Sequence, residues 1–151
     1  MQRKTTNDMQ VTPYFTFDGN CEEALNFYAQ AFHGQIKNLS RFEGSPAEEM
    51  TSQKHRVLHA QFVAKKICFM ASDSGDESWK ASGGNMMHLS VDFDDPGELE
   101  KTFKALSEGA TISMPLQDTF WGARFGMLTD RYGINWMFNH DYEKEEKTAK
   151  S

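Results

Sequence analysis

Histidine is the residue type in this chain best suited to acid–base or metal chemistry, because its unperturbed pKa lies near 6.5. Of the five histidines, His88 has the most polar neighbours: Ser90 and Asp92 follow it at alternate positions in MHLSVDF. Alternate residues on a strand share a face but lie roughly 7 Å apart, too far for a direct nucleophile–base bond. The spacing therefore does not support a serine triad, and His88 could instead act as a proton carrier. The alternative is a pocket-lining histidine held by one hydrogen bond.

A second candidate lies in DTFWGARFGMLTDRYGINWMF, residues 118–138. Trp121 could stack on a planar ligand, and Arg124 could pair with an anionic one. The alternative is structural: the FWG segment packs a hairpin turn, and Arg124 forms an ordinary salt bridge. Trp136 and Phe138 are predicted to be core residues on the buried face of the last strand.

The composition excludes several classes of protein. The net charge is −6 and no basic cluster is present, so we do not expect nucleic acid or an anionic membrane as a partner. No apolar run approaches the roughly 20 residues of a membrane span, and the N-terminus lacks the apolar stretch of a secretory signal. Cys21 and Cys68 are predicted to be free thiols of a cytoplasmic protein.

The chain contains an internal repeat. FDGNCEEALNFYAQAFHG and FDDPGELEKTFKALSEG align at an offset of 93 − 17 = 76 residues. Identical residues at this offset are Phe17/Phe93, Asp18/Asp94, Glu22/Glu98, Phe27/Phe103 and Ala29/Ala105. Each copy has a strand, a helix and further strands, which predicts two βαβββ units, residues 11–72 and 86–139. We expect them to form one domain over 11–139, with flexible tails at 1–10 and 140–151.

Capping chemistry predicts one helix in each copy. Asn20 is the expected N-cap of the first helix, and Gly34 is expected to end it in the left-handed conformation. Asp95 is the expected cap of the second helix, with Pro96 at its first position and Gly109 at its end. The apolar stripes are Ala24, Leu25, Tyr28, Ala31 and Phe32 in the first helix, and Leu99, Thr102, Phe103 and Leu106 in the second.

Alternating polar and apolar residues predict the strands. They span residues 11–18, 56–63 and 67–72 in the first copy, and 87–93, 110–116, 123–129 and 133–139 in the second. In several strands an apolar face backs a polar one. Two curved sheets with polar inner faces would form a trough lined by Thr12, Tyr14, His59, Gln61, Met70, His88, Ser90, Asn135 and Met137.

These features resemble the vicinal oxygen chelate superfamily, which includes glyoxalases, bleomycin-resistance proteins and extradiol dioxygenases. The start FDGN-CEEAL-NFY and the string MPLQDTFWGARFGMLTDRYGINW are most similar to its PhnB-like branch, over roughly residues 11–139. The resemblance implies an α+β fold of two βαβββ modules, a curved cup-like mixed sheet with backing helices, and a homodimer. The branch is often labelled a demethylubiquinone methyltransferase. We give that label little weight, since no glycine-rich nucleotide loop follows a strand.

The resemblance also places the metal ligands of the superfamily on this chain. The four positions fall on Thr12, Met70, His88 and Met137, so that one histidine remains and a thioether stands where the carboxylate is expected. Hard divalent ions prefer oxygen and imidazole donors, and we therefore predict no four-ligand metal centre and no cofactor. A divalent metal held weakly at His88 is the alternative.

Three functions are compatible with this sequence. The first is a PhnB-like protein that binds a small molecule of unknown identity in the trough. The second is a divalent-metal-dependent lyase, isomerase or dioxygenase in which His88 is catalytic. The third is a dimeric interaction module whose site is vestigial. The missing metal ligands favour the first function over the second, and the polar trough favours both over the third.

Overall fold

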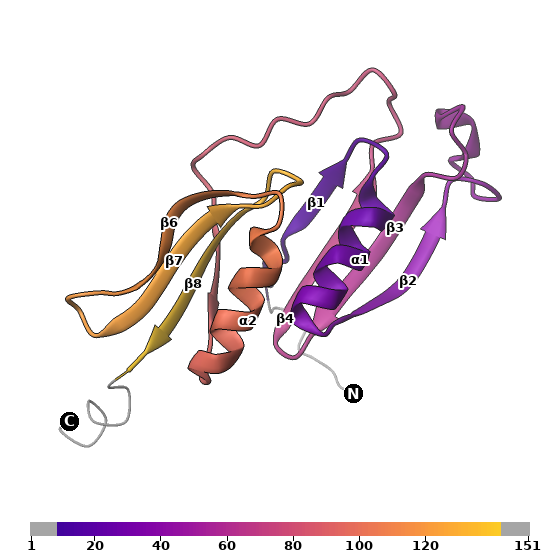
Figure 1. Cartoon of the computed structure of the whole chain (residues 1–151). Coiled ribbons are helices and arrows are strands. Elements are labelled where there is room, and N and C mark those ends of the chain that lie inside the picture. The colour runs from indigo at the N-terminus through magenta and orange to yellow at the C-terminus, as the bar shows by residue number, and fades with distance from the viewer. Residues whose placement is uncertain (1–8, 143–151) are drawn as a thin grey trace. The chain divides into compact units, whose positions relative to one another are not determined.

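The computed structural model describes residues 9–142 (Figure 1), so most of the two predicted tails lies outside the described residues. The elements are β1 (Tyr14–Phe17), α1 (Cys21–Phe32), β2 (Gln35–Arg41), the 3₁₀ helix η1 (Glu48–Met50), β3 (Val57–Ala64), β4 (Ile67–Asp73), β5 (Leu89–Asp92), α2 (Pro96–Ser107), β6 (Thr111–Asp118), β7 (Ala123–Thr129) and β8 (Asn135–Asp141). None of the helices in this described range is long and apolar enough to cross a membrane.

The chain divides into two compact units. Within the described residues, the first comprises 9–29 and 33–81, and the second comprises 30–32 and 82–142. We call them the first module and the second module. Each contains one four-stranded sheet, with strand order β1-β4-β3-β2 in the first and β5-β8-β7-β6 in the second.

The two sheets share one topology. In each, the first strand pairs in parallel with the last, as β1 with β4 and β5 with β8, and the other neighbours are antiparallel. A helix follows the first strand of each sheet and lies across one of its faces (Figure 1). The predicted α+β class and the βαβββ repeat are thus confirmed.

The start of α1 differs from the prediction. Asn20 makes no side-chain cap hydrogen bond. Instead, Oδ1 of Asp73, at the end of β4, accepts hydrogen bonds from the backbone N–H groups of Gly19 and Cys21, both at 2.9 Å. Oδ2 of the same carboxylate accepts from the N–H of Val57 at 2.9 Å. Asn20 therefore occupies the N-cap position as predicted, but its side chain does not cap the helix, because a buried acid from a distant strand accepts hydrogen bonds from the N–H groups at the helix start.

The end of α1 differs as well. His33, rather than Gly34, adopts the left-handed conformation, with φ of 58°. Gly34 is needed for space instead: a Cβ at this position would lie 2.5 Å from Cζ of Phe62 and 2.9 Å from the carbonyl oxygen of Val63. The glycine lets the end of α1 approach β3 closely.

Helix α2 follows the prediction. Oδ1 of Asp95 accepts a hydrogen bond from the N–H of Gly97 at 3.0 Å, and Pro96 is the first helical residue. After the helix, Gly109 has a φ of 75°. The predicted apolar stripe is buried along its length, at Leu99, Thr102, Phe103 and Leu106.

Several strands differ from the sequence pattern. Strand β1 begins at Tyr14 rather than at residue 11, and β6 continues to Asp118, past the predicted end at 116. The sequence pattern predicts no strand at β2. This mostly polar edge strand has a register against β3 that shifts between Lys37 and Arg41, and its Asn38 has a φ of 55°. A bulged edge strand lacks the strict alternation on which the prediction depends. Strand β8 continues two residues past the predicted end at 139, because Asp141 still pairs with Ala123 of β7.

Aromatic side chains fill the space between helix and sheet in each module. In the first, Tyr28 of α1 packs edge-on against Phe62, with ring centroids 6.4 Å apart. In the second, Phe103 of α2 packs edge-on against Phe138 at 5.1 Å, and Trp136 is 1% exposed. The prediction that Trp136 and Phe138 are core residues is confirmed. The opposite face of each sheet, which we call its open face, is turned away from the module's own helix.

Candidate functional site

The open face of the first sheet carries a row of predicted pocket residues. The register aligns Tyr14 of β1 with Met70 of β4, and Met70 with Gln61 of β3. Aligned residues on neighbouring strands point to the same face, so the three side chains are neighbours. His59 lies two residues before Gln61 on β3 and therefore shares this face. The structure thus brings four of the predicted residues together.

Tyr14 and His59 interact directly on this face, across the width of β4. Oη of Tyr14 lies 3.2 Å from Nδ1 of His59, and the ring centroids are 5.8 Å apart. Which group donates depends on the imidazole tautomer. Tyr14 is 47% exposed, so a phenol and an imidazole that can each donate or accept a hydrogen bond face the solvent together.

Two further predicted residues of the first module have different surroundings. Oε1 of Gln61 accepts a hydrogen bond from Nδ2 of Asn38 at 2.7 Å, which orients the Gln61 amide on the open face. Thr12 lies before β1, where its hydroxyl accepts from Nε2 of Gln10 at 3.3 Å. The register of β1 begins at Tyr14, so the strand pairing does not place Thr12 in this row.

The open face of the second sheet has a different composition. Ser90 of β5 aligns with Met137 of β8, and Met137 aligns with Met127 of β7. In the next row, Nδ2 of Asn139 donates to Oδ1 of Asp92 at 3.1 Å. Ser90 and Met137 are therefore neighbours, as predicted, but thioethers occupy most of their row.

The side chain of Asn135 is committed to the protein. Its Nδ2 donates to the carbonyl oxygens of Gly84, at 3.2 Å, and Met87, at 2.9 Å. Its Oδ1 accepts from the hydroxyl of Thr129 at 2.7 Å. Asn135 is only 9% exposed, and its amide has no hydrogen atom left for a ligand. It anchors the segment that leads into His88, whereas the sequence had suggested a ligand contact.

His88 itself is exposed and precedes β5. Among residues 9–142, no side chain or carbonyl group forms a hydrogen bond with its ring. His59 therefore has a hydrogen-bonded partner, Tyr14, whereas the ring of His88 has none among residues 9–142.

Trp121 and Arg124 serve opposite sides of the second sheet. Trp121, in the turn between β6 and β7, is 49% exposed and packs on Phe125, with ring centroids 5.9 Å apart. Phe125 aligns with Asn139 and so belongs to the open face. Arg124 points the other way, where its Nε binds the carboxylate of Glu100 on α2. Neighbouring strand residues alternate in direction, so Arg124 lies on the helix side of the sheet, whereas Trp121 packs on its open side through Phe125.

The charge of Arg124 is matched by two acids. The hydrogen bond that Arg124 donates to the Glu100 carboxylate raises the pKa of Arg124. Asp118 lies 3.1 Å from Nη1 of Arg124 and accepts a hydrogen bond from Tyr142 Oη at 2.8 Å. The Tyr142 hydrogen bond, followed by those from Arg124, lowers the pKa of Asp118. Arg124 and Asp118 therefore both stay charged. This arrangement agrees with the alternative that Arg124 forms an ordinary salt bridge.

The donor set of this chain does not fit the superfamily's hard divalent metal. A hydroxyl, two thioethers and one imidazole stand at the four ligand positions, and thioethers bind soft ions in preference to hard ones. No three His, Cys, Asp or Glu side chains within residues 9–142 gather as a candidate metal site. No chemical step through a metal follows from these residues.

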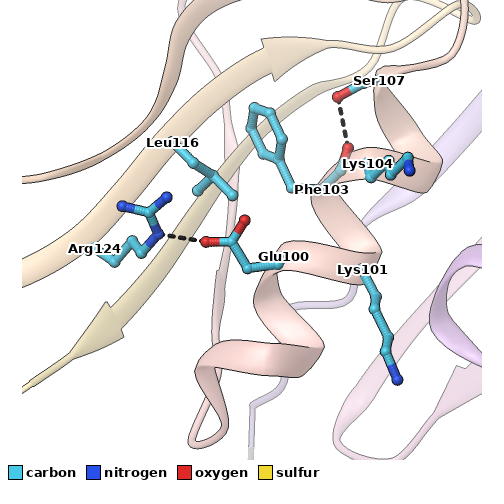
Figure 2. A pocket seen from close by; sticks show the side chains of 7 residues that line it. All are labelled: Glu100, Lys101, Phe103, Lys104, Ser107, Leu116 and Arg124. Atoms are coloured by element: carbon cyan, nitrogen blue, oxygen red, sulfur yellow. Dashed lines mark hydrogen bonds and ion pairs between the residues drawn. The ribbon is translucent and has the colours of Figure 1, made fainter.

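Sequence reasoning missed two features. Thr16 and Ser72 align with each other on the open face of the first sheet; strand alternation places both on this face, although the predicted trough does not include them. A groove beside α2, lined by Glu100, Lys101, Phe103, Lys104, Ser107, Leu116 and Arg124, was also missed (Figure 2). It depends on the packing of α2 against β6, which no local pattern predicts.

The 3-demethylubiquinone-9 3-methyltransferase family matches residues 9–138. The chain is similar to protein PA1353 from Pseudomonas aeruginosa, at 38% identity and a TM-score of 0.78, over 89% of this chain and 98% of that chain. It is similar to the PhnB protein from Bacillus cereus at 28% identity and a TM-score of 0.73, over 87% and 99% of the two chains.

A glyoxalase/bleomycin resistance protein/dioxygenase domain from Frankia sp. shares the fold, with 13% identity and a TM-score of 0.63 over 91% of this chain and 96% of that domain. At such identity the likeness concerns the fold alone. The sequence repeat and the equivalent strand orders of the two sheets of this chain agree with that fold. The chain therefore belongs to the PhnB-like 3-demethylubiquinone-9 3-methyltransferase family, with the fold of the vicinal oxygen chelate superfamily.

Proposed function

We propose that the chain binds a small molecule on the open face of the first sheet, without a four-ligand metal centre. The observation that carries this proposal is the Tyr14–His59 hydrogen bond of 3.2 Å on a partly exposed sheet face. Binding sites combine apolar surface with a few oriented polar groups. The phenol and imidazole supply the polar groups here, and the half-buried side chain of Met70 lies beside Tyr14.

The chemistry of this face suggests the class of ligand. Tyr14 and His59 can each donate or accept a hydrogen bond, and the Gln61 amide is held in place by Asn38. The Met70 thioether favours contact with a flat aromatic ring. We therefore expect a small oxygenated or aromatic molecule rather than a peptide or a polyanion.

A second function is favoured by the same pair. A hydrogen bond between a phenol and an imidazole is a route for moving a proton, so the face could serve an enzyme acting on an oxygenated substrate. In that case His59, rather than His88, would exchange the proton. The metal-dependent form of this alternative lacks suitable donors, as described above.

The experiment is a thermal-shift screen of oxygenated and aromatic compounds, run with and without EDTA. A ligand that binds only the native protein raises the melting temperature. For a hit, Tyr14→Phe and His59→Gln are expected to weaken binding by roughly five- to tenfold each, the effect of one hydrogen bond. His55→Gln, an exposed histidine on the loop before β3, is the matched control and should bind normally.

The outcomes separate the functions. Binding that survives EDTA and depends on Tyr14 supports the metal-free binder. Binding that is lost in EDTA contradicts the metal-free binder and favours the metal-dependent enzyme. Binding that is weakened by His88→Ala but not by His59→Gln has the same meaning. No hit at all favours the vestigial module. We also propose that the protein is a homodimer, and a monomer mass in light scattering would refute that part.

A further inference from the structure

The second module contains a groove that the proposed function does not use. It lies between α2 and the β6–β7 hairpin, on the side of the sheet that faces the helix, and has a volume of about 460 Å³. Figure 2 shows Phe103 and Leu116 facing each other across it, with the Arg124–Glu100 pair beside Leu116 and Ser107 at the far end. The groove therefore has an apolar floor and a charged rim.

The floor is set by the packing of α2. Phe103 is 7% exposed and Leu116 is half-buried. A Cβ on Gly126 would lie 2.9 Å from Phe103 and 3.0 Å from Leu116, so the two side chains meet above a glycine. The hydroxyl of Ser107 already donates to the carbonyl oxygen of Phe103 at 2.6 Å. This part of the groove favours a hydrocarbon group over a polar one.

The rim is positively charged in a chain of net charge −6. Three lining residues are cationic and one is acidic. Arg124 is occupied by Glu100 and Asp118. Lys101 and Lys104 are exposed, and neither forms an ion pair with any carboxylate in the described part of the chain. Their positive charge is not offset in the way that the charge of Arg124 is.

The adjoining edge of the sheet disfavours a peptide strand as the occupant. Strand β6 is an edge strand, but Pro115 has no N–H to offer, and its register shifts on both sides of Met114. Such irregularities prevent continuous pairing with an added strand. The volume suits a compact molecule, at the lower end of the range for small-ligand sites.

We propose that this groove binds a small anionic amphiphile, such as a medium-chain or aromatic carboxylate. The hydrocarbon part lies on Phe103 and Leu116, and the carboxylate pairs with Lys104, with Lys101 one turn away adding to the attraction. Lysine stems add apolar surface along the rim while their ammonium groups remain in water. Glu100 opposes the anion and holds Arg124 away from it.

The test uses octanoate and its neutral counterpart octanol, titrated into ¹⁵N-labelled full-length protein. Octanoate is expected to shift backbone amide signals of α2 and β6. Octanol should bind the same amides roughly three- to tenfold more weakly, the effect of about one surface ion pair and its neighbours. Equal affinities, or octanoate shifts confined to other strands, would overturn the proposal.

Three variants sharpen the test because their expected effects differ in sign. Lys104→Glu should weaken octanoate binding by roughly three- to tenfold and leave octanol unchanged. Glu100→Gln should strengthen octanoate binding about threefold, because it removes the opposing charge and releases Arg124. Lys66→Glu, an exposed lysine of the first module, makes the same change in net charge and should have no effect. Equal weakening by Lys104→Glu and Lys66→Glu would refute the site.

Discussion

The open faces of the two sheets differ in chemistry although their strands correspond one to one. Tyr14 in the first sheet takes the place of Ser90 in the second, since they align with Met70 and Met137 respectively. By the same register, Gln61 corresponds to Met127. Two residues earlier on the same strands, His59 corresponds to Phe125.

This comparison shows where the repeat could change. The helix-facing positions remain apolar and buried in both modules, as in Phe62 and the corresponding Leu128, because packing against a helix requires apolar surface. The open faces are free of that requirement. In the first, Tyr14, His59 and Gln61 form hydrogen-bonding surface, whereas a thioether and an aromatic ring stand at two of the corresponding positions of the second, Met127 and Phe125. The proposed binding site is therefore assigned to the first sheet.

The modules also start their helices differently. Helix α1 is capped by Asp73, a buried acid (4% exposed) that belongs to β4 and also binds β3. Helix α2 is capped by Asp95, an exposed residue next to the helix. One cap fastens a helix to its sheet, whereas the other satisfies only local donors.

The largest expected effect is that of Asp73→Ala. The change leaves the N–H groups of Gly19, Cys21 and Val57 without their acceptor, and we expect the free energy of unfolding to fall by about 3–5 kcal/mol. Asp95→Ala is the matched control, with an expected loss of about 1 kcal/mol. Urea denaturation measures both. Equal losses would show that the two caps are equivalent.

A second contrast concerns two glycines that follow the helices. Gly34→Ala places a methyl group 2.5 Å from Phe62, against the buried β3, and should cost about 2–3 kcal/mol. Gly109→Ala meets only the side chain of Arg131, at 3.1 Å, and has the strain of a φ of 75°. We expect a loss of about 1 kcal/mol for it. A larger loss at Gly109, measured by urea denaturation, would contradict the packing role of Gly34.

The fold was predictable because its signals are local or repeated. Asp95 and Pro96, two adjacent residues, predict the start of α2. Because the sequence repeats, elements predicted in one module are also predicted at the equivalent positions of the other. The cap of α1 was not predictable, because Asp73 lies 54 positions from Gly19. Strand β2 was missed since the bulge near Asn38 breaks its alternation.

Only one property of the site was predictable from the sequence: the face of the sheet on which each strand residue lies. Alternation placed Tyr14 and Met70 on one face, and the register made them neighbours. It could not show that Tyr14 bonds His59, two strands away, or that the Asn135 amide is consumed by backbone carbonyls. Those contacts depend on side-chain geometry between distant segments, which the period of two does not describe.

Exchanging the corresponding residues of the open faces should have a small effect on stability. His59→Phe removes one partly exposed hydrogen bond, and Phe125→His loses contact with Trp121. We expect each change to alter the free energy of unfolding by less than about 1 kcal/mol, as measured in urea. A loss near that of Asp73→Ala would show that the open faces help to specify the fold.

The segment that joins the modules is fastened by two different groups. Within the first module, Oε2 of Glu77 accepts hydrogen bonds from the hydroxyl of Thr51 at 2.6 Å and from the N–H and hydroxyl of Ser52 at 2.6 and 2.8 Å. Within the second module, the neutral amide of Asn135 holds the same segment at Gly84 and Met87. Only the first fastening carries a charge that acid can remove.

The smallest expected effect is therefore a pH dependence confined to the Glu77 fastening. The hydrogen bond from Thr51, followed by those from Ser52, lowers the pKa of Glu77 to about 2 from 4.5. A lowered folded-state pKa stabilises the fold above the unfolded value and loses that contribution as the pH falls through about 2. The difference in free energy of unfolding between the wild type and Glu77→Gln should thus shrink as the pH falls from about 4.5 to about 2.

Asn135→Leu is the control. The difference in free energy of unfolding between the wild type and Asn135→Leu should stay constant over that interval, because an amide does not titrate. Parallel pH profiles for the two variants in urea denaturation would show that the charge of Glu77 does not contribute to this fastening.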